Sequence, residues 1–356
     1  MIYFAVDELR VSLMANYLAG ERGRPLRDRI HQITYAELFR TRALPRGAWI
    51  FSALDALSDA ELWMVHHLQS AARDAGLPVF NAAREALHRY ELLQSLHQSG
   101  RNDFRAHRAD GPLDTIRFPV FVRLADKHTG SLTPLLHDRA ALQRAFAYLW
   151  LRRLPLRHLL VTEFCETASA DGFYRKYSIF RIGDAYIPRH LLIGRHWMTK
   201  GETRETDETL ICEEMTYLGE NPHVAWAREV FQTARIEYGR LDYGVRNGRP
   251  QAWEINFTPV LAGDPHPNGA APGGRLTHPA KERSNAAMRE AFERIDPGSM
   301  QGDEVRVEFP SGLEKQARHE RGSIQSLERS QRRIGRIATI SGLRAVGPLL
   351  RRAFGG

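Results

Sequence analysis

The stretch Arg240–Pro259, RLDYGVRNGRPQAWEINFTP, decides the fold of this chain. It contains two β-patterned runs separated by Asn247–Gly248, a dipeptide typical of tight hairpin turns. Asp242 lies on the first run, and Glu254 and Asn256 lie on the second. Residues i and i+2 of a strand project from the same face, so Glu254 and Asn256 point at one spot.

These side chains form a set of hard oxygen ligands. Trp253, Ile255 and Phe257 alternate with the two polar residues, so one face of the run is apolar. An isolated Glu-x-Asn on a strand is more often solvent-facing, and it is the apolar partner face that favours a site here. With no Cys or His among them, the ligands favour Mg²⁺ or Mn²⁺ over zinc. Because Mg²⁺ in such sites usually also binds substrate phosphates, the pattern indicates a nucleotide enzyme.

The site requires a particular hairpin register. A plain two-residue turn at Asn247–Gly248 pairs Asp242 with Trp253, which points Asp242 away from Glu254. Shifting the pairing by one residue brings Asp242 opposite Glu254, and this needs a three-residue loop or a bulge. Pro250 favours such an irregularity because it donates no ladder hydrogen bond. We predict the shifted register, with both carboxylates on one face.

Composition sets the frame for the whole chain. With 356 residues and 43% hydrophobic content, it is long enough for two or three domains. No apolar run approaches the roughly 18 residues of a membrane span. The start, MIYFAVDE, lacks the cationic region of a signal peptide. Cys165 and Cys212 are the only cysteines and define neither a disulfide framework nor a zinc pattern, so a cytoplasmic location is expected.

The basic charge is concentrated at the C-terminus. Ten Lys/Arg and three Glu lie between Gly312 and Gly356, so this tail holds +7 of the formal charge of +8. Such tails are most often solvated appendages, and an acidic membrane surface, a nucleic acid or an acidic protein is the alternative partner. Gly335, Gly342 and Pro348 interrupt a long helix and weaken the membrane alternative.

Strands and helices alternate along the body, which is typical of an α/β protein. Residues 1–117 read as a small doubly wound domain, 118–296 as a second region, and 297–356 as the tail. Ser58 and Glu61 form a capping box at a helix that runs to Gly76. Outside the hairpin, the expected strands are Ile2–Val6, Trp49–Ala53, Pro78–Phe80 and Phe118–Arg123. Three further strands, Leu159–Phe164, Phe173–Ile182 and Ala185–Leu192, are expected in one mostly antiparallel sheet. The other expected helices are Glu8–Ala19, Ala82–His97, Asp138–Leu151, Pro222–Glu237 and Pro279–Ile295, and a loop at Ala262–Gly274 precedes the last of them.

The order of these parts resembles the ATP-grasp superfamily between roughly Gly76 and Thr258. FPVFVR is similar to the strand that ends in a phosphate-binding Lys, VTEFCE to the adenine-binding hinge, and LDYG…WEINFTP to the metal motif. The resemblance implies an α/β (α+β) ATP-grasp fold with an N-terminal pre-ATP-grasp domain. It also implies ATP and two Mg²⁺ ions, held by Asp242, Glu254 and Asn256.

Further roles follow from the resemblance. Glu163 is the candidate for the adenine amino group, with backbone contacts from Phe164 and Cys165. Asp171 is the candidate for the ribose hydroxyls. Lys176 is the candidate for the phosphates, and Arg175 beside it faces the opposite way. The remaining two candidates are Arg123 for the phosphates and Arg189 for a transferring phosphoryl group or a substrate carboxylate.

Two features depart from the family pattern. Arg123 stands where the resemblance implies Lys, and a guanidinium is bulkier and less point-like. The following loop, ADKHTG, has only Gly130, although backbone amides approach phosphate most easily where glycine permits unusual torsions. Either change is consistent with a reshaped pocket or with a pocket that binds nucleotide without turnover.

The resemblance implies an ATP-dependent ligase that joins a small-molecule carboxylate to an amine, or to a thiol, through an acyl-phosphate. Two alternatives stay open. One is a kinase that phosphorylates a small hydroxyl, and the other is a non-catalytic nucleotide-binding or scaffold protein. Neither the substrate nor the oligomeric state follows from the sequence.

Overall fold

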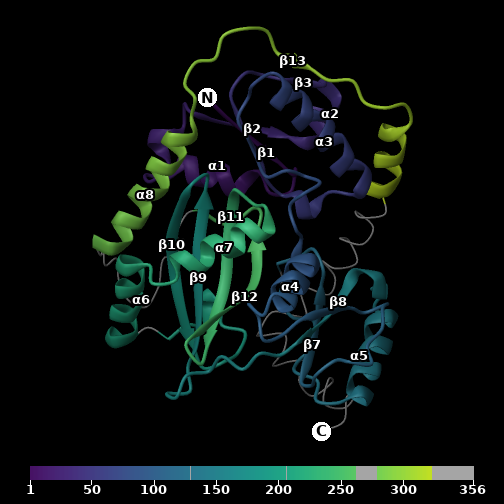
Figure 1. Cartoon of the computed structure of the whole chain (residues 1–356), viewed down its shortest axis with the longest axis vertical. Coiled ribbons are helices and arrows are strands. Elements are labelled where there is room, and N and C mark those ends of the chain that lie inside the picture. The colour runs from purple at the N-terminus through teal and green to yellow at the C-terminus, as the bar shows by residue number, and fades with distance from the viewer. Residues whose placement is uncertain (129, 206, 262–278, 323–356) are drawn as a thin grey trace. The chain divides into compact units, whose positions relative to one another are not determined.

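The computed structural model describes residues 1–128, 130–205, 207–261 and 279–322, which belong to two compact units (Figure 1). Unit 1 combines Met1–His88 with Thr167–Glu314, and unit 2 combines Arg89–Glu166 with the chain from Lys315. The boundaries of these units differ from the domain boundaries expected from the sequence, which lie after residues 117 and 296. The N-terminal sheet and the hairpin share one unit because their apolar side chains form a common core.

The first half of unit 1 is built on a parallel sheet of strand order β2-β1-β4-β5. Its central strands are continuous apolar runs, as expected where helices cover both faces. The predicted capping box forms both hydrogen bonds between Ser58 and Glu61. The elements are β1 (Ile2–Val6), α1 (Val11–Ala19), β2 (Ile30–Thr34), α2 (Tyr35–Thr41), β3 (Ala43–Leu44), β4 (Ala48–Phe51), α3 (Asp59–Asp74) and β5 (Val79–Phe80), with β13 (Val305–Arg306) beside β3.

The second half of unit 1 is an antiparallel sheet of strand order β10-β9-β11-β12. Helices α6 and α7 lie against it. On the face that these helices cover, the sheet contributes Tyr177 and Tyr243 to an aromatic cluster with Tyr217. The opposite face places Phe180 and Tyr238 in the core shared with β1 and α8. The elements are β9 (Tyr174–Ile182), β10 (Ala185–Gly194), α6 (Glu208–Glu220), α7 (Val224–Ala234), β11 (Tyr238–Arg246), β12 (Arg249–Asn256) and α8 (Pro279–Ile295).

Unit 2 contains a three-stranded antiparallel sheet of order β6-β8-β7, with α5 packed against it. The prediction that the Leu159–Phe164 strand shares a sheet with the next two strands is therefore wrong. This strand pairs with β7 and β6 instead, because its apolar side chains complete the core under α5. The elements are α4 (Arg89–Gln98), β6 (Ala106–Arg108), β7 (Val120–Leu124), α5 (Arg139–Leu151) and β8 (Leu159–Glu163).

One predicted helix is shorter than expected, and one predicted loop cannot be compared. The Ala82–His97 helix begins only at Arg89. The preceding residues form turns, and the amide of Leu87 donates to the carbonyl of Ala234, which is incompatible with a continuous helix. The predicted loop Ala262–Gly274 lies outside the described residues.

Asn81 joins the two sheets of unit 1. It is fully buried after β5 and has a positive φ of 67°. Its Nδ2 donates to the carbonyls of Phe51 and Tyr238, at 3.2 and 2.8 Å. Its Oδ1 accepts the amides of Glu237 and Tyr238, both at 2.9 Å. Every polar group of the side chain is thus used to hold β4 and β11 in place.

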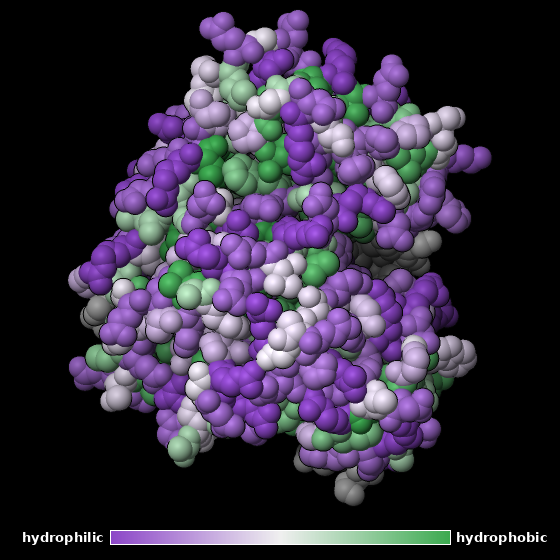
Figure 2. All heavy atoms as spheres, viewed as in Figure 1, coloured by the Kyte–Doolittle hydropathy of each residue, from purple (hydrophilic) through white to green (hydrophobic). Residues whose placement is uncertain are grey.

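The face shown in Figure 2 is mostly hydrophilic, with apolar residues in small scattered groups. Among the helices in the described ranges, none has both the length and the apolar character needed to cross a bilayer. The described residues form a mixed α/β fold, as the sequence predicts. It has one four-stranded parallel sheet and antiparallel sheets of four, three and two strands.

We expect Asn81→Ala to lower the free energy of unfolding by about 3 kcal/mol, because buried amides and carbonyls lose their partners and a non-glycine residue must still adopt positive φ. Urea denaturation followed by circular dichroism measures the change. Asn16→Ala, on the exposed side of α1, is the control and should leave the midpoint in place. A midpoint for Asn81→Ala equal to that of the control would contradict this role.

Candidate functional site

The β11–β12 hairpin has the predicted register. Asp242 pairs with Glu254 and Arg240 pairs with Asn256. The turn itself has only two residues, Asn247 and Gly248, both with positive φ. The extra residue lies in β12 at Trp253, where the register shifts between Asp242 and Tyr243, so the bulge alternative is confirmed and Pro250 is not its location.

Gly244 makes room for the bulge. A Cβ on Gly244 would lie 2.6 Å from Cζ2 of Trp253, closer than nonbonded carbon atoms approach. The indole can therefore pack over the backbone of β11 only because this residue has no side chain. The bulge in turn places Glu254 directly opposite Asp242, where paired residues have Cβ atoms roughly 5 Å apart.

Asp242 is the centre of the polar face. Its side chain is 1% exposed and lies against two cations. Arg240 donates to both carboxylate oxygens of Asp242, from Nε to Oδ1 at 2.7 Å and from Nη2 to Oδ2 at 3.0 Å. Nζ of Lys176 lies 2.8 Å from Oδ2. Burial alone raises the pKa of Asp242, but the charges of Arg240 and Lys176 outweigh it and hold the pKa well below its usual value. Asp242 is therefore a buried, fully charged carboxylate.

Two neighbouring cations of β9, Arg175 and Lys176, lie on opposite faces of the sheet. Lys176 points to Asp242, and Arg175 points to the other face, where it pairs with Asp171 and Glu213. The predicted opposition of Lys176 and Arg175 is thus confirmed. Asp171 does not lie on the Asp242 face, because both of its carboxylate oxygens accept hydrogen bonds from Arg175, at 3.0 and 2.7 Å. Its ribose role stays a prediction.

The oxygen atoms on this face suit a hard divalent cation. Asp242 and Glu254 supply carboxylates, and Asn256 supplies an amide oxygen that already accepts the amide of Thr258 at 2.8 Å. Oγ1 of Thr258 is buried and finds no hydrogen-bond partner among the described residues. No group of three or more His, Cys, Asp and Glu side chains suited to a metal occurs in the described part of the chain. The donors fit Mg²⁺ only if phosphate and water oxygens complete its shell.

Arg189 is a buried bridge within unit 1. It sits at a bulge of β10 and is 5% exposed. Its Nη2 donates to the carbonyl of Leu261 at 2.6 Å, and its Nη1 donates to Oδ1 of Asn285 on α8 at 2.8 Å. Burial lowers the pKa of Arg189 to about 10. The geometry thus gives Arg189 the role of fixing the chain after β12, and its catalytic role stays a prediction.

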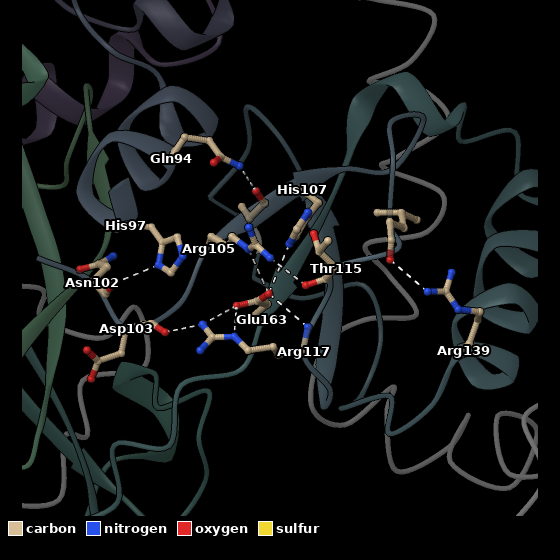
Figure 3. Close-up of polar contacts among 12 residues, drawn as sticks. Gln94, His97, Asn102, Asp103, Arg105, His107, Thr115, Arg117, Arg139 and Glu163 are labelled. Carbon is tan, nitrogen blue, oxygen red and sulfur yellow. Dashed lines mark hydrogen bonds and ion pairs between the residues drawn. The ribbon is translucent and has the colours of Figure 1, made fainter. Parts of the chain in front are cut away.

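Glu163 of unit 2 is enclosed by the side chains of Arg105, His107 and Arg117 (Figure 3). Its side chain is 2% exposed. Arg117 binds Oε2 with Nη2 at 2.7 Å and Nε at 3.0 Å, and its amide binds Oε1 at 3.1 Å. Arg105 and His107 approach Oε1 at 3.3 Å. Burial raises the pKa of Glu163, but the hydrogen bonds from His107 and Arg117 lower it to about 2.

This arrangement uses the acceptor capacity of Glu163, since a carboxylate offers about four lone-pair sites. An adenine amino group could bind only by displacing Arg105, His107 or Arg117. At the neighbouring predicted backbone contacts, the amide of Phe164 already donates to the carbonyl of Pro119, and Cys165 is half-buried and outside any disulfide. The adenine role of this segment therefore stays a prediction, and the observed role of Glu163 is to hold β6 and β8 together.

Arg123 lies near the end of β7, opposite Leu160 of β8, and is half-buried. Its Nη2 is 3.4 Å from the carbonyl of Lys127, so the guanidinium contacts the loop that the sequence assigns to phosphate. Arg123 and Glu163 belong to unit 2, and Lys176, Asp242, Glu254 and Asn256 belong to unit 1.

Sequence reasoning named Lys176 but missed Arg240 beside Asp242 and the three side chains around Glu163. Arg240 is two positions before Asp242, and the alternation of strand side chains could have placed both on one face. Arg105, His107 and Arg117 could not be assigned to Glu163 in this way, because they come from a different strand and a loop far away in the sequence.

A cavity of about 280 Å³ in unit 1 lies elsewhere. Arg175, Tyr177 and Val245 line it, and these residues alternate with those of the Asp242 face. It is therefore on the opposite side of the sheet from the candidate metal ligands.

No family model matches the chain, and no curated protein matches it. Many solved structures are similar to it. One is D-alanine--D-alanine ligase from Bacillus anthracis complexed with ATP, with 13% identity, a TM-score of 0.46, and coverage of 83% of this chain and 95% of that chain. The RimK domain protein ATP-grasp from Sphaerobacter thermophilus has 14% identity, a TM-score of 0.44, and coverage of 83% and 99%. L-amino acid ligase from Bacillus licheniformis has 12% identity, a TM-score of 0.41, and coverage of 74% and 67%.

The second of these proteins bears the name of the superfamily that the motifs resemble. Likenesses at this distance carry no functional argument, so the function of the chain has to be inferred from its own residues.

We expect Glu163→Gln to lower the free energy of unfolding by about 2 kcal/mol at pH 7, because Arg105 and Arg117 lose a charged partner and the His107 ring loses a carboxylate partner. In the wild type, the stability supplied by a carboxylate of depressed pKa is complete above about pH 5 and is lost as the pH falls towards 2. Glu163→Gln should flatten the dependence of stability on pH across this window.

Denaturant midpoints measured between pH 2 and 7 test this expectation. Glu91→Gln is the control, since Glu91 pairs with Arg108 at the surface, with side chains 43% and 46% exposed. Equal pH profiles for Glu163→Gln and Glu91→Gln would contradict the assigned role of Glu163.

Proposed function

We propose that this chain is an ATP-dependent ligase of the ATP-grasp type that joins a carboxylate to an amine. The observation that carries the proposal is the polar face of β9, β11 and β12, where Asp242 and Glu254 are paired and two cations lie against Asp242. Paired carboxylates next to cations match the charge pattern of a metal-bound polyphosphate. We expect the reaction to take place in the cytosol.

In this proposal Asp242, Glu254 and Asn256 hold Mg²⁺, which when bound neutralises phosphate charge. Lys176 and Arg240 neutralise Asp242, and in this proposal they turn to the phosphate oxygens when the carboxylate binds a cation. Both are 15–22% exposed at the side chain, so they can reach a ligand. Arg123 remains a phosphate contact on the strength of the sequence pattern.

The chemistry of the proposed reaction has two steps. A carboxylate oxygen of the substrate attacks the γ-phosphorus of ATP, ADP leaves, and an acyl-phosphate forms. The amine then attacks the acyl carbon and expels inorganic phosphate, while its proton passes to solvent or to a base. The role of Lys176 and Arg240 is to stabilise charge on the transferring group.

A non-catalytic nucleotide-binding protein is the second candidate, and one observation favours it. Glu163, where the resemblance implies the adenine-binding hinge, is already bound by the side chains of Arg105, His107 and Arg117. Arg123 also stands in place of Lys. Both features are consistent with a pocket that has lost turnover.

Product analysis separates the candidates. The enzyme is incubated with ATP, Mg²⁺ and sets of amino acids and small carboxylates, and ADP release is measured with and without hydroxylamine, which traps an acyl-phosphate as a hydroxamate. ADP with a condensed product or hydroxamate supports the ligase, ADP with a phosphoester supports a kinase, and nucleotide binding without ADP supports the non-catalytic candidate.

We expect Glu254→Gln to reduce Mg²⁺-dependent ADP release by roughly 100-fold or more, because the charge that holds the cation is lost while the shape of the side chain is kept. Calorimetric titration with Mg²⁺ and ATP should show weakened binding of the metal complex. Glu213→Gln, a change on α6 that removes a partner of Arg175 on the opposite side of the sheet, should leave both measurements at the wild-type level. Wild-type ADP release from Glu254→Gln would remove the main support for the metal site.

A further inference from the structure

The C-terminal end of α5 carries an exposed patch in which apolar and basic side chains are neighbours. Trp150 is 69% exposed and Leu151 is 72% exposed, the highest values among the exposed large apolar residues of the described chain. Arg152 and Arg153 follow directly and are exposed as well. We call Arg144, Trp150, Leu151, Arg152, Arg153 and Arg157 the α5 patch.

The outer side of α5 is unlike its inner side. Leu142, Ala145 and Leu149 face the core of unit 2 together with Val120 and Val161. The residues at three- and four-residue spacing on the outer side are all exposed, and they are Ala140, Gln143, Arg144, Ala147, Trp150 and Leu151. The outer side thus carries no acid, and its two large apolar residues, Trp150 and Leu151, lie at the same end as Arg152 and Arg153.

The charge of the segment has one sign. Residues 139–162 contain five arginines and neither Asp nor Glu. Asp138 immediately precedes the segment and caps the opposite, N-terminal end of α5. The dipole of α5 accounts for Arg152 and Arg153 at a helix C-terminus, but it does not account for an exposed Trp and Leu beside them.

We propose that the α5 patch attaches unit 2 to the surface of an anionic lipid bilayer. Trp is favoured at the headgroup level of a bilayer, Leu enters the acyl boundary, and arginines bind acidic headgroups. The guanidinium of Arg152 lies 5.2 Å from the ring centre of Tyr148, so it is held beside the apolar residues rather than directed away from them.

Other occupants fit the patch less well. The C-terminal tail and a second copy of the patch have the same positive sign, so either would bring like charges together. RNA would satisfy the arginines and could stack on Trp150, but it offers nothing for Leu151 and Ala147. A bilayer surface satisfies both kinds of residue at once. Attachment of this kind lies at the surface and involves no membrane-spanning helix.

Vesicle flotation of the full chain tests the proposal. We expect flotation with phosphatidylcholine vesicles that contain about one third phosphatidylserine, and weak flotation with phosphatidylcholine alone. The double change Trp150→Ser and Leu151→Ser should reduce binding by about tenfold or more. The double change Arg152→Glu and Arg153→Glu should reduce it similarly and weaken its dependence on salt.

Trp63→Ser is the matched control, because Trp63 is 41% exposed on unit 1 with Arg84 stacked on it, and its binding should equal that of the wild type. All four residues of the double variants are exposed, and circular dichroism checks that the variants fold. A second measurement, quenching of tryptophan fluorescence by brominated lipid, should be smaller in Trp150→Phe than in Trp63→Phe.

Two results would overturn the proposal. One is flotation of both double variants at the wild-type level, which would assign membrane binding to the basic tail. The other is the absence of wild-type flotation. Binding of labelled single-stranded RNA that the same variants weaken would then make the patch a nucleic-acid surface.

Discussion

The cost of burying the carboxylate of Asp242 determines much of the arrangement of unit 1. A charge at 1% exposure is tolerated only with close partners, and Arg240 and Lys176 supply them from the same face of the sheet. That face is shared with Glu254 only because β12 is bulged at Trp253. The bulge is accommodated because Gly244 leaves space for the indole ring. A buried charge, a bulge and a glycine are therefore parts of one structural solution.

The second buried carboxylate, Glu163, is held in a different way. Asp242 lies beside a second carboxylate and next to cations that are partly exposed, so its surroundings can accept a divalent ion and phosphates. Glu163 is surrounded by donors on both oxygens and has no acceptor capacity left. Two carboxylates that sequence patterns assign to one nucleotide thus differ in what they can still bind. Their difference bears directly on the choice between turnover and binding alone.

The proposed function and the proposed lipid contact use separate parts of the chain. The polar face of the β11–β12 hairpin belongs to unit 1, and the α5 patch belongs to unit 2. Substitutions in one need not change the other, because no residue is shared between them. A carboxylate–amine ligase that attaches to an anionic bilayer would act near that surface, which makes amphiphilic carboxylates and amines reasonable members of a substrate screen.

Local patterns in the sequence determined the alternation of strands and helices, the Ser58–Glu61 cap, and the shared face of Glu254 and Asn256, because each depends on residues only a few positions apart. Parity arguments also gave the hairpin register, although the bulge was not located. The partners of strand β8, the hydrogen bonds of Asn81 and the cations around Glu163 were decided only by the tertiary structure. These contacts join residues that are distant in the sequence, and such pairing depends on how apolar faces pack, which no local pattern records.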